Sequence, residues 1–197
     1  MVISGPTGSG KTMWDRQLIN SSKTASYPPP KKIYYFYGEY QAIFSQLNGV
    51  NFIQGLPEDY INKLGGVNEP TWVIIDDLMS ESTNSQMIAD LFTKGSHHRN
   101  LSVILLVQNF FAKGKEMRNI TLNSHYIVMF KNPRDKSLAS NIGRQMYPNK
   151  ITKFQKIFED ATLKPYSYLF VDCKPDTPEE IRLLSNIWTS PISVYSI

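Results

Sequence analysis

Continuous apolar runs recur along the chain, and they alternate with segments in which apolar residues repeat with a helical period. A short apolar run between polar residues predicts a strand covered on both faces, as in a parallel sheet. The predicted strands are 1–4, 32–37, 51–54, 71–77, 101–107, 125–130 and 166–171. The predicted helices are 11–20, 39–47, 57–64, 85–94, 135–146 and 152–161.

This alternation predicts an α/β fold with a mainly parallel central sheet and helices on both faces. We expect one domain over residues 1–173 and a C-terminal extension over 174–197, where prolines are frequent and little regular structure is expected outside 179–184. Only four residues precede the first glycine-rich segment, so either the first strand is unusually short or, as we expect, the native chain begins a few residues upstream of Met1.

Composition narrows the class of protein. The chain has 197 residues, of which 41% are hydrophobic, and a single cysteine, Cys173. One cysteine excludes an intrachain disulfide framework, and we expect it to be a small buried strand residue. No apolar run approaches the roughly 20 residues of a membrane span, and no leader segment is recognisable. The net charge of +4 is compatible with a polyanionic partner.

The segment after the first strand matches the phosphate-binding pattern G-x-x-x-x-G-K-[ST] in full. It reads Gly5-Pro6-Thr7-Gly8-Ser9-Gly10-Lys11-Thr12. Glycines let backbone N–H groups turn toward an anion, while the lysine reaches the β- and γ-phosphates and the threonine hydroxyl binds Mg²⁺. The alternative is an ordinary glycine-rich turn, but the strand before it and the helix after it favour a site for ATP and Mg²⁺.

Polar residues follow two of the buried strands. Asp76 and Asp77 end the run 71–77, and Gln108 follows the run 101–107. Carboxyl ends of parallel strands meet at one edge of a sheet, so we expect these side chains to lie beside the phosphate-binding loop. Asp76 then holds the metal, Asp77 polarises the attacking water, and Gln108 contacts the γ-phosphate. Glu81 is an alternative base.

Residues 93–100 lie between these two strands and contain Arg99, the nearest candidate for an arginine finger on a neighbouring subunit's γ-phosphate. A solvated loop arginine is the alternative. His97 and His98 are adjacent and have no third ligand nearby, so no metal site is expected there. Basic residues in 110–118, with Lys150, Lys153 and Lys156, form either a phosphate-contacting surface or a solvated face.

These residues resemble a known family. Gly5–Thr12, 72–77 and Gly95-Ser96-His97-His98-Arg99-Asn100 running into Gln108-Asn109 are similar to the genome-packaging ATPases of the FtsK–HerA superfamily. The likeness is greatest to those of polinton-type elements, adintoviruses and virophages, with the poxvirus packaging ATPase more distant. It continues through 130–136 and 166–178.

The resemblance implies a P-loop NTPase of the additional-strand type that hydrolyses ATP and moves double-stranded DNA into a capsid. It implies a homo-oligomeric ring of about five or six subunits, action inside a virus-infected host cell, and the capsid vertex as a further partner. By position, Lys11, Thr12, Asp76, Asp77 and Gln108 take the roles given above. Two departures are the Asp at position 77, where the superfamily often has Glu, and the place of Arg99, for which Arg134 and Arg144 are rivals.

Two other functions stay open on the sequence. A P-loop kinase for a nucleoside or small metabolite would need an acceptor pocket and an arginine-rich lid, and no such arginine cluster is found. A DNA helicase or secretion-type pump of the same lineage would share every motif named above.

Overall fold

The computed structural model describes residues 1–66, 69–76, 78, 86–95, 99–111 and 115–197. The strands are β1 (Val2–Ser4), β2 (Lys32–Tyr37), β3 (Val50–Gln54), β4 (Thr71–Asp76), β5 (Leu101–Val107), β6 (Tyr126–Phe130), β7 (Tyr168–Asp172), β8 (Leu183–Ser185) and β9 (Ser193–Tyr195). The helices are α1 (Lys11–Asn20), α2 (Ser22–Ala25), α3 (Glu58–Ile61), α5 (Gln86–Asp90), α7 (Lys115–Leu122), α8 (Ser137–Met146) and α9 (Ile151–Ala161).

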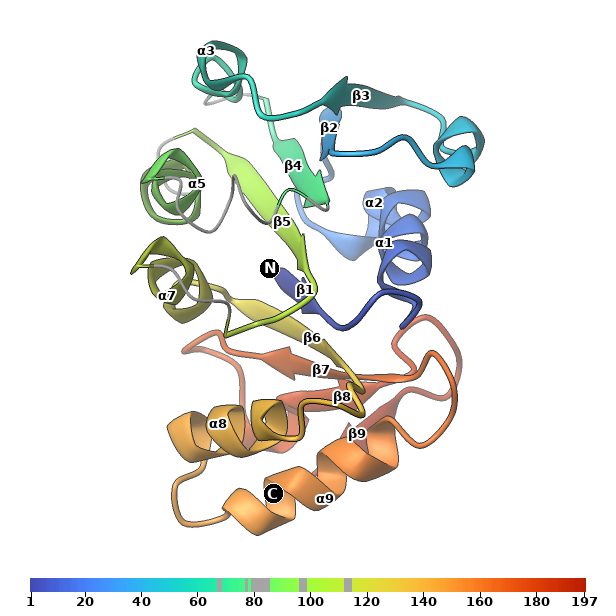
Figure 1. The fold of residues 1–197 in the computed structure, drawn as a ribbon, viewed down its shortest axis with the longest axis vertical. Coiled ribbons are helices and arrows are strands. Elements are labelled where there is room, and N and C mark those ends of the chain that lie inside the picture. Colours follow the sequence, from blue (N-terminus) through green and yellow to red (C-terminus); the bar gives the residue numbers. More distant parts are fainter. Residues whose placement is uncertain (67–68, 77, 79–85, 96–98, 112–114) are drawn as a thin grey trace.

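Within the described residues the strands form one sheet in the order β3-β2-β4-β5-β1-β6-β7-β8-β9 (Figure 1). The strands from β3 to β6 pair in parallel, and β7, β8 and β9 pair antiparallel. β5 lies between β1, which leads into the phosphate-binding loop, and β4, which ends at Asp76. This inserted strand is the additional strand that the fold prediction requires.

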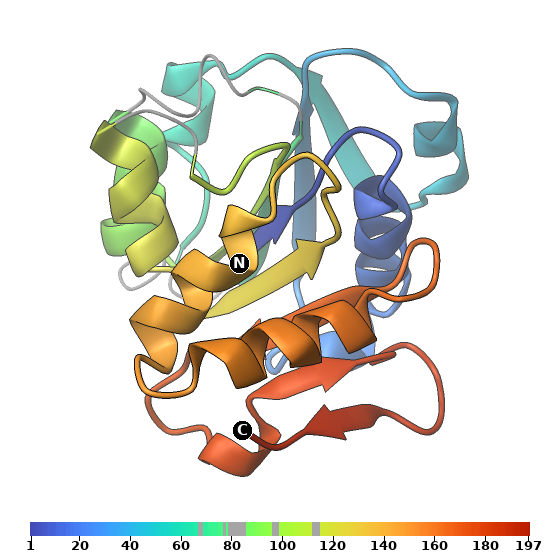
Figure 2. The same cartoon turned by 60° about the horizontal axis from the view of Figure 1, so that its bottom comes forward.

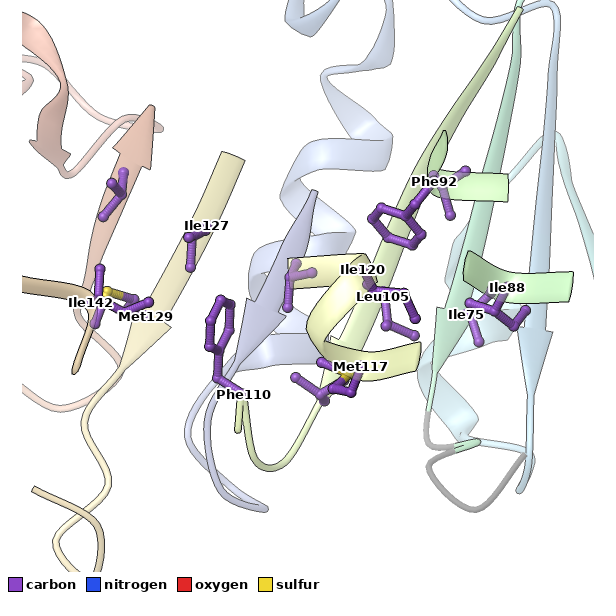
Figure 3. Packing of buried hydrophobic residues seen from close by; sticks show 14 of the residues in the cluster. Ile75, Ile88, Phe92, Leu105, Phe110, Met117, Ile120, Ile127, Met129 and Ile142 are labelled. Atoms are coloured by element: carbon purple, nitrogen blue, oxygen red, sulfur yellow. The ribbon is translucent and has the colours of Figure 1, made fainter. Parts of the chain in front are cut away.

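Each face of the sheet packs against its own apolar cluster. On one face, residues of β4, β5 and β6 such as Ile75, Leu105 and Met129 contact the helices α5, α7, α8 and α9 (Figure 3). On the other face, Trp14 and Leu18 of α1 pack over Tyr35, Ile74 and neighbouring residues. Because both faces are covered, the central strands read as the continuous apolar runs seen in the sequence.

Two predicted helices are much shorter in the structure. In place of 39–47 there is one 3₁₀ turn, Ala42–Gln46, because Gln41 is extended and Phe44 is drawn into a cluster of rings with Tyr35 and Phe52. In place of 57–64 only α3 is helical, and the chain leaves it at Gly65 with a φ of 84°. In 39–47 the packing of Phe44 against neighbouring rings overrides a weak helical pattern.

Beyond residue 174, regular structure was expected only around 179–184, where a 3₁₀ turn (Glu179–Ile181) and the start of β8 do lie, but the expectation is wrong for β9. β8 and β9 extend the sheet beyond β7, and Leu183 of β8 is completely buried. Figure 2 shows this C-terminal hairpin below α9, continuous with the rest of the sheet. The domain boundary at residue 174 stays a prediction, but the last strands belong to the same sheet as the phosphate-binding loop.

Among the helices in the described ranges, none combines the length and the apolar character needed to cross a membrane.

Candidate nucleotide-binding site

The phosphate-binding loop begins directly at the carboxyl end of β1. The Gly5 N–H donates to the carbonyl of Val107 at the end of β5 (3.1 Å), so the loop is anchored to the neighbouring strand. Ser9 N–H closes a turn onto the carbonyl of Pro6 (3.1 Å), and α1 starts at Lys11. The N–H groups of a first helical turn have no helical acceptor, which makes this turn a site for an anion.

Two glycines of the loop have backbone angles that favour glycine. Gly8 has a φ of 76° and Gly10 a φ of 108°. Lys11 lies across the loop, where its Nζ donates to the carbonyl oxygens of Gly5 (2.6 Å) and Pro6 (3.1 Å). The lysine is therefore held at the loop, with its charge at the place where a phosphate would be bound.

A cavity of about 290 Å³ lies beside the loop. It is lined by Thr7, Gly8, Lys11, Thr12, Gln41, Asp76, Leu106, Val107 and Gln108. The structure therefore brings together the loop, the end of β4 and the end of β5, as the strand-end argument predicted. It adds a fourth part of the sequence, the loop after β2, through Gln41.

Asp76 is the acidic residue of this cavity, and it is almost fully buried, with 4% of its surface exposed. Its Oδ2 accepts a hydrogen bond from the Tyr35 hydroxyl (2.9 Å) and another from Gln41 Nε2 (3.4 Å). Burial, and then the carboxyl groups of Asp15 and Asp76, raise the pKa of Tyr35 far above its usual range. The Tyr35 hydroxyl therefore stays protonated and acts as a donor that fixes one oxygen of Asp76.

Tyr35 and Gln41 were not identified from the sequence. Tyr35 lies within an aromatic run that reads only as a strand, and the register that sets it opposite Ile74, diagonal to Asp76, is a tertiary feature. Gln41 follows the carboxyl end of β2. The rule that placed Gln108 in the site, a polar residue after a parallel strand, would also have found Gln41.

The oxygen donors of the cavity fit Mg²⁺. The Thr12 hydroxyl and the Asp76 carboxylate line the same space as Lys11. Within the described residues no group of three or more His, Cys, Asp or Glu side chains forms a ready-made metal cage. One carboxylate and one hydroxyl suit Mg²⁺ at a nucleotide, because this ion keeps several waters and takes one or two protein oxygens together with phosphate oxygens.

Arg99 lies away from this cavity. It precedes β5, whereas Gln108 follows β5, so the two are at opposite edges of the sheet. The Arg99 side chain donates from Nε to the carbonyl of Leu64 (2.8 Å) and from Nη2 to the carbonyl of Ile61 (2.6 Å). Ile61 is the last residue of α3 and Leu64 lies in the turn that follows it, so Arg99 fixes the end of that helix. It does not reach the nucleotide site of its own subunit.

Some predicted residues lie outside the described residues: Asp77, Glu81, His97, His98 and Lys113. The other basic residues of the sequence prediction with described side chains, Arg118, Lys150, Lys153 and Lys156, are exposed. Arg134 is also exposed, and it follows β6 at the same edge of the sheet as the phosphate-binding loop.

A second cavity, of about 310 Å³, lies at the amino ends of the strands, where it is lined by residues such as Leu101, Ser102 and His125. No residue of the phosphate-binding loop borders it. The candidate site is therefore the cavity at the carboxyl ends.

The sheet order, the loop and the acidic strand together define a P-loop NTPase fold of the additional-strand type, as the sequence predicted. No family model matches the chain, and no curated protein matches it either. Solved structures do match. The genome packaging NTPase B204 from Sulfolobus turreted icosahedral virus 2, in complex with ATP-γS, superposes with a TM-score of 0.61 at 17% identity, over 100% of this chain and 96% of that one.

Two further matches are similar in extent. B204, described as the DNA-packaging ATPase from Sulfolobus turreted icosahedral virus, has a TM-score of 0.62 at 16% identity, over 100% of this chain and 96% of that one. The AMPPCP complex of B204 from Sulfolobus turreted icosahedral virus 2 has a TM-score of 0.57 at 17% identity, over 100% of this chain and 96% of that one. At such identities the likeness establishes the fold and its extent over the whole chain.

Proposed function

We propose that this chain is an ATP-hydrolysing translocase that packages double-stranded DNA of a viral or virus-like genome into a capsid. The observation that carries the proposal is the cavity at the carboxyl ends of the strands, where Lys11, Thr12, Asp76 and Gln108 meet. The fold shared with a genome packaging NTPase supports it, as does the packaging-ATPase pattern of the sequence.

In this proposal the glycine-rich loop and Lys11 bind the β- and γ-phosphates. Thr12 and Asp76 hold Mg²⁺, which supplies charge neutralisation on the phosphate oxygens when it is bound. Tyr35 and Gln41 both donate to Oδ2 of Asp76 and so hold this carboxylate at the cavity. Gln108 orients the γ-phosphate and the attacking water without adding charge, and Asp77 polarises that water.

An arginine from a neighbouring subunit completes the site in a ring ATPase. We retain Arg99 as a candidate on sequence grounds, although its guanidinium is engaged by the end of α3. Arg134 is a rival whose position favours it, because it is exposed at the edge of the sheet where the phosphates would bind. Mixing Lys11→Ala subunits with Arg99→Ala or Arg134→Ala subunits tests both. The finger is the arginine whose mixture recovers turnover.

The proposed partners are double-stranded DNA, other copies of the chain in a ring of about five or six, and the capsid vertex. The proposed place of action is a virus-infected cell, in the nucleus or a cytoplasmic factory, or the virion. Among packaging ATPases, we propose that the nearest relatives are those of polinton-type elements, adintoviruses and virophages, on the motifs of the sequence.

A triplex-displacement assay tests translocation on duplex DNA. The proposal predicts ATP-dependent removal of a third strand bound to long duplex DNA, and no removal with Lys11→Ala. Separation of the duplex strands would instead identify a helicase. Transfer of the γ-phosphate to an added nucleoside, with no effect of DNA, would identify a small-molecule kinase and contradict the proposal.

A further inference from the structure

Asp15 is a second buried acidic residue near the nucleotide site. It lies on α1, four residues after Lys11, and only 1% of its surface is exposed. Neither of its carboxyl oxygens has a hydrogen-bond partner within the described part of the chain. A buried carboxyl group without a partner lowers stability, so its place beside a functional site calls for a physical explanation.

The surroundings of Asp15 connect it to the metal-binding carboxylate. The register pairs Tyr35 with Ile74, which lies two residues before Asp76 on the same face of β4, and α1 covers this face. The Asp15 carboxyl makes no hydrogen bond of ordinary length to the Tyr35 hydroxyl, but it is near enough to raise the pKa of Tyr35, and the Asp76 carboxylate raises the pKa of Asp15 in turn. The Tyr35 hydroxyl donates to Asp76 Oδ2 at 2.9 Å. Tyr35 therefore has carboxyl groups near it from two neighbouring elements, Asp76 of β4 and Asp15 of α1.

We propose that Asp15 is a positioning residue for nucleotide hydrolysis, which acts on Asp76 through Tyr35. The tyrosine has one hydroxyl hydrogen, and it must point to Asp76 for the carboxylate to be held. A polar group next to the Tyr35 oxygen favours the orientation in which the hydroxyl hydrogen points to Asp76, whereas an apolar group would not favour it. This inference rests on the proposed function, because it assigns Asp15 to the same nucleotide site.

The state of Asp15 is consistent with this role. Burial first, and the Asp76 carboxylate second, raise the pKa of Asp15 well above its usual range, while the Tyr35 hydroxyl offsets only part of the effect. Asparagine offers a similar polar group of the same shape, and leucine does not.

The test compares Asp15→Asn, Asp15→Leu and Tyr35→Phe, with Tyr168→Phe as the matched control. Tyr168 is a buried tyrosine on the same face, but its hydroxyl accepts from the Ile187 N–H. Three quantities are measured: the melting temperature, Mn²⁺ binding to the nucleotide-loaded protein by electron paramagnetic resonance, and the Mg²⁺ dependence of kcat and KM for ATP.

Asp15→Leu and Tyr35→Phe should each weaken Mn²⁺ binding at least threefold and lower kcat. The KM for ATP should stay within twofold of that of the unaltered protein, and ATP binding in EDTA should not change. Asp15→Leu should melt at the same temperature as the unaltered protein or higher. Asp15→Asn and Tyr168→Phe should keep the metal dependence. Asp15 and Tyr35 are proposed to act on Asp76 together. The double variant Asp15→Leu with Tyr35→Phe should therefore bind Mn²⁺ no more weakly than the weaker of the two single variants.

Unchanged metal binding in Asp15→Leu and Tyr35→Phe, with ATP hydrolysis intact, would overturn the positioning role and leave the proposed function standing. Asp15→Asn that behaves as Asp15→Leu would also overturn it. Failure of the unaltered protein to hydrolyse any nucleotide would instead overturn the proposed function, and this inference with it.

Discussion

At the scale of single residues, the phosphate-binding loop depends on close approaches that only glycine allows. A Cβ at Gly5 would lie 2.6 Å from both Phe130 Cβ and Ser9 Oγ, and no real Cβ comes so near to other atoms. Phe130 is buried at the end of β6, so it cannot move aside. Packing of the loop against β6 therefore requires glycine at position 5, apart from any requirement of phosphate binding.

Gly5→Ala should lower the free energy of unfolding by about 1–3 kcal/mol because of this overpacking. It should also abolish nucleotide binding, since the loop must move. Gly66→Ala is the control, because a Cβ there would meet nothing within 4 Å. Urea unfolding and titration with a fluorescent ATP analogue measure both effects. Equal stability of the two variants would contradict the packing argument.

Cys173 directly follows β7 and is half-buried. Burial and the neighbouring Asp172 raise the pKa of its thiol from 9.0 to about 11. The thiolate fraction at pH 8 should fall about 100-fold, so a thiol reagent should react far more slowly with the folded protein than with the chain in guanidinium. The unfolded chain loses the thiol proton at a lower pH than the folded protein does. The free energy of unfolding should therefore decline as the pH rises above about 9. Equal labelling rates would contradict the shift.

At the scale of elements, Arg99 holds α3 in place. This helix has a single turn, which is too short to be stable alone. The guanidinium satisfies the carbonyls of Ile61 and Leu64 at its end, and Ile61 itself is fully buried. The short pattern in the sequence indicated a helix but not its length, because the arginine that ends it comes 35 residues or more later in the chain.

Arg99→Ala should therefore lower the free energy of unfolding by about 1.5–3 kcal/mol, the range for hydrogen bonds from a charged group. Arg144→Ala, which removes an exposed arginine on α8, should change it by less than about 0.5 kcal/mol. Urea unfolding of both variants gives the comparison. If Arg99→Ala were as stable as the unaltered protein, its side chain would be available for another role, including that of the finger.

Leu183 tests whether the last strands are integral to the domain. It is completely buried on β8 within the same cluster as the core of β5 and β6. Leu183→Ala should cost about 2–5 kcal/mol, whereas Ile192→Ala, at a residue that is 51% exposed, should cost little. Thermal melting measures both. A small effect at Leu183 would mean that the C-terminal hairpin contributes little to the fold.

At the scale of the whole molecule, the order of the strands brings the loop after β1, Gln108 after β5 and Asp76 of β4 to one cavity. The central strands were predictable because each is a continuous apolar run, and the loop was predictable because its pattern is complete. β8 and β9 were not, because Leu183–Ser185 and Ser193–Tyr195 are too short to show a period. Within the site, Tyr35 and Asp15 were missed because burial and strand register, which no local pattern reveals, decide what they contact.

The central claim is that one cavity, built by Lys11, Thr12, Asp76 and Gln108, hydrolyses ATP in the service of DNA movement. The most direct measurement is the rate of phosphate release from ATP and Mg²⁺, with and without long duplex DNA. The account predicts turnover that duplex DNA stimulates severalfold, and that Lys11→Ala lowers at least about 100-fold while the melting temperature stays within a few degrees. Turnover that persists in Lys11→Ala, or that duplex DNA leaves unchanged, would contradict it.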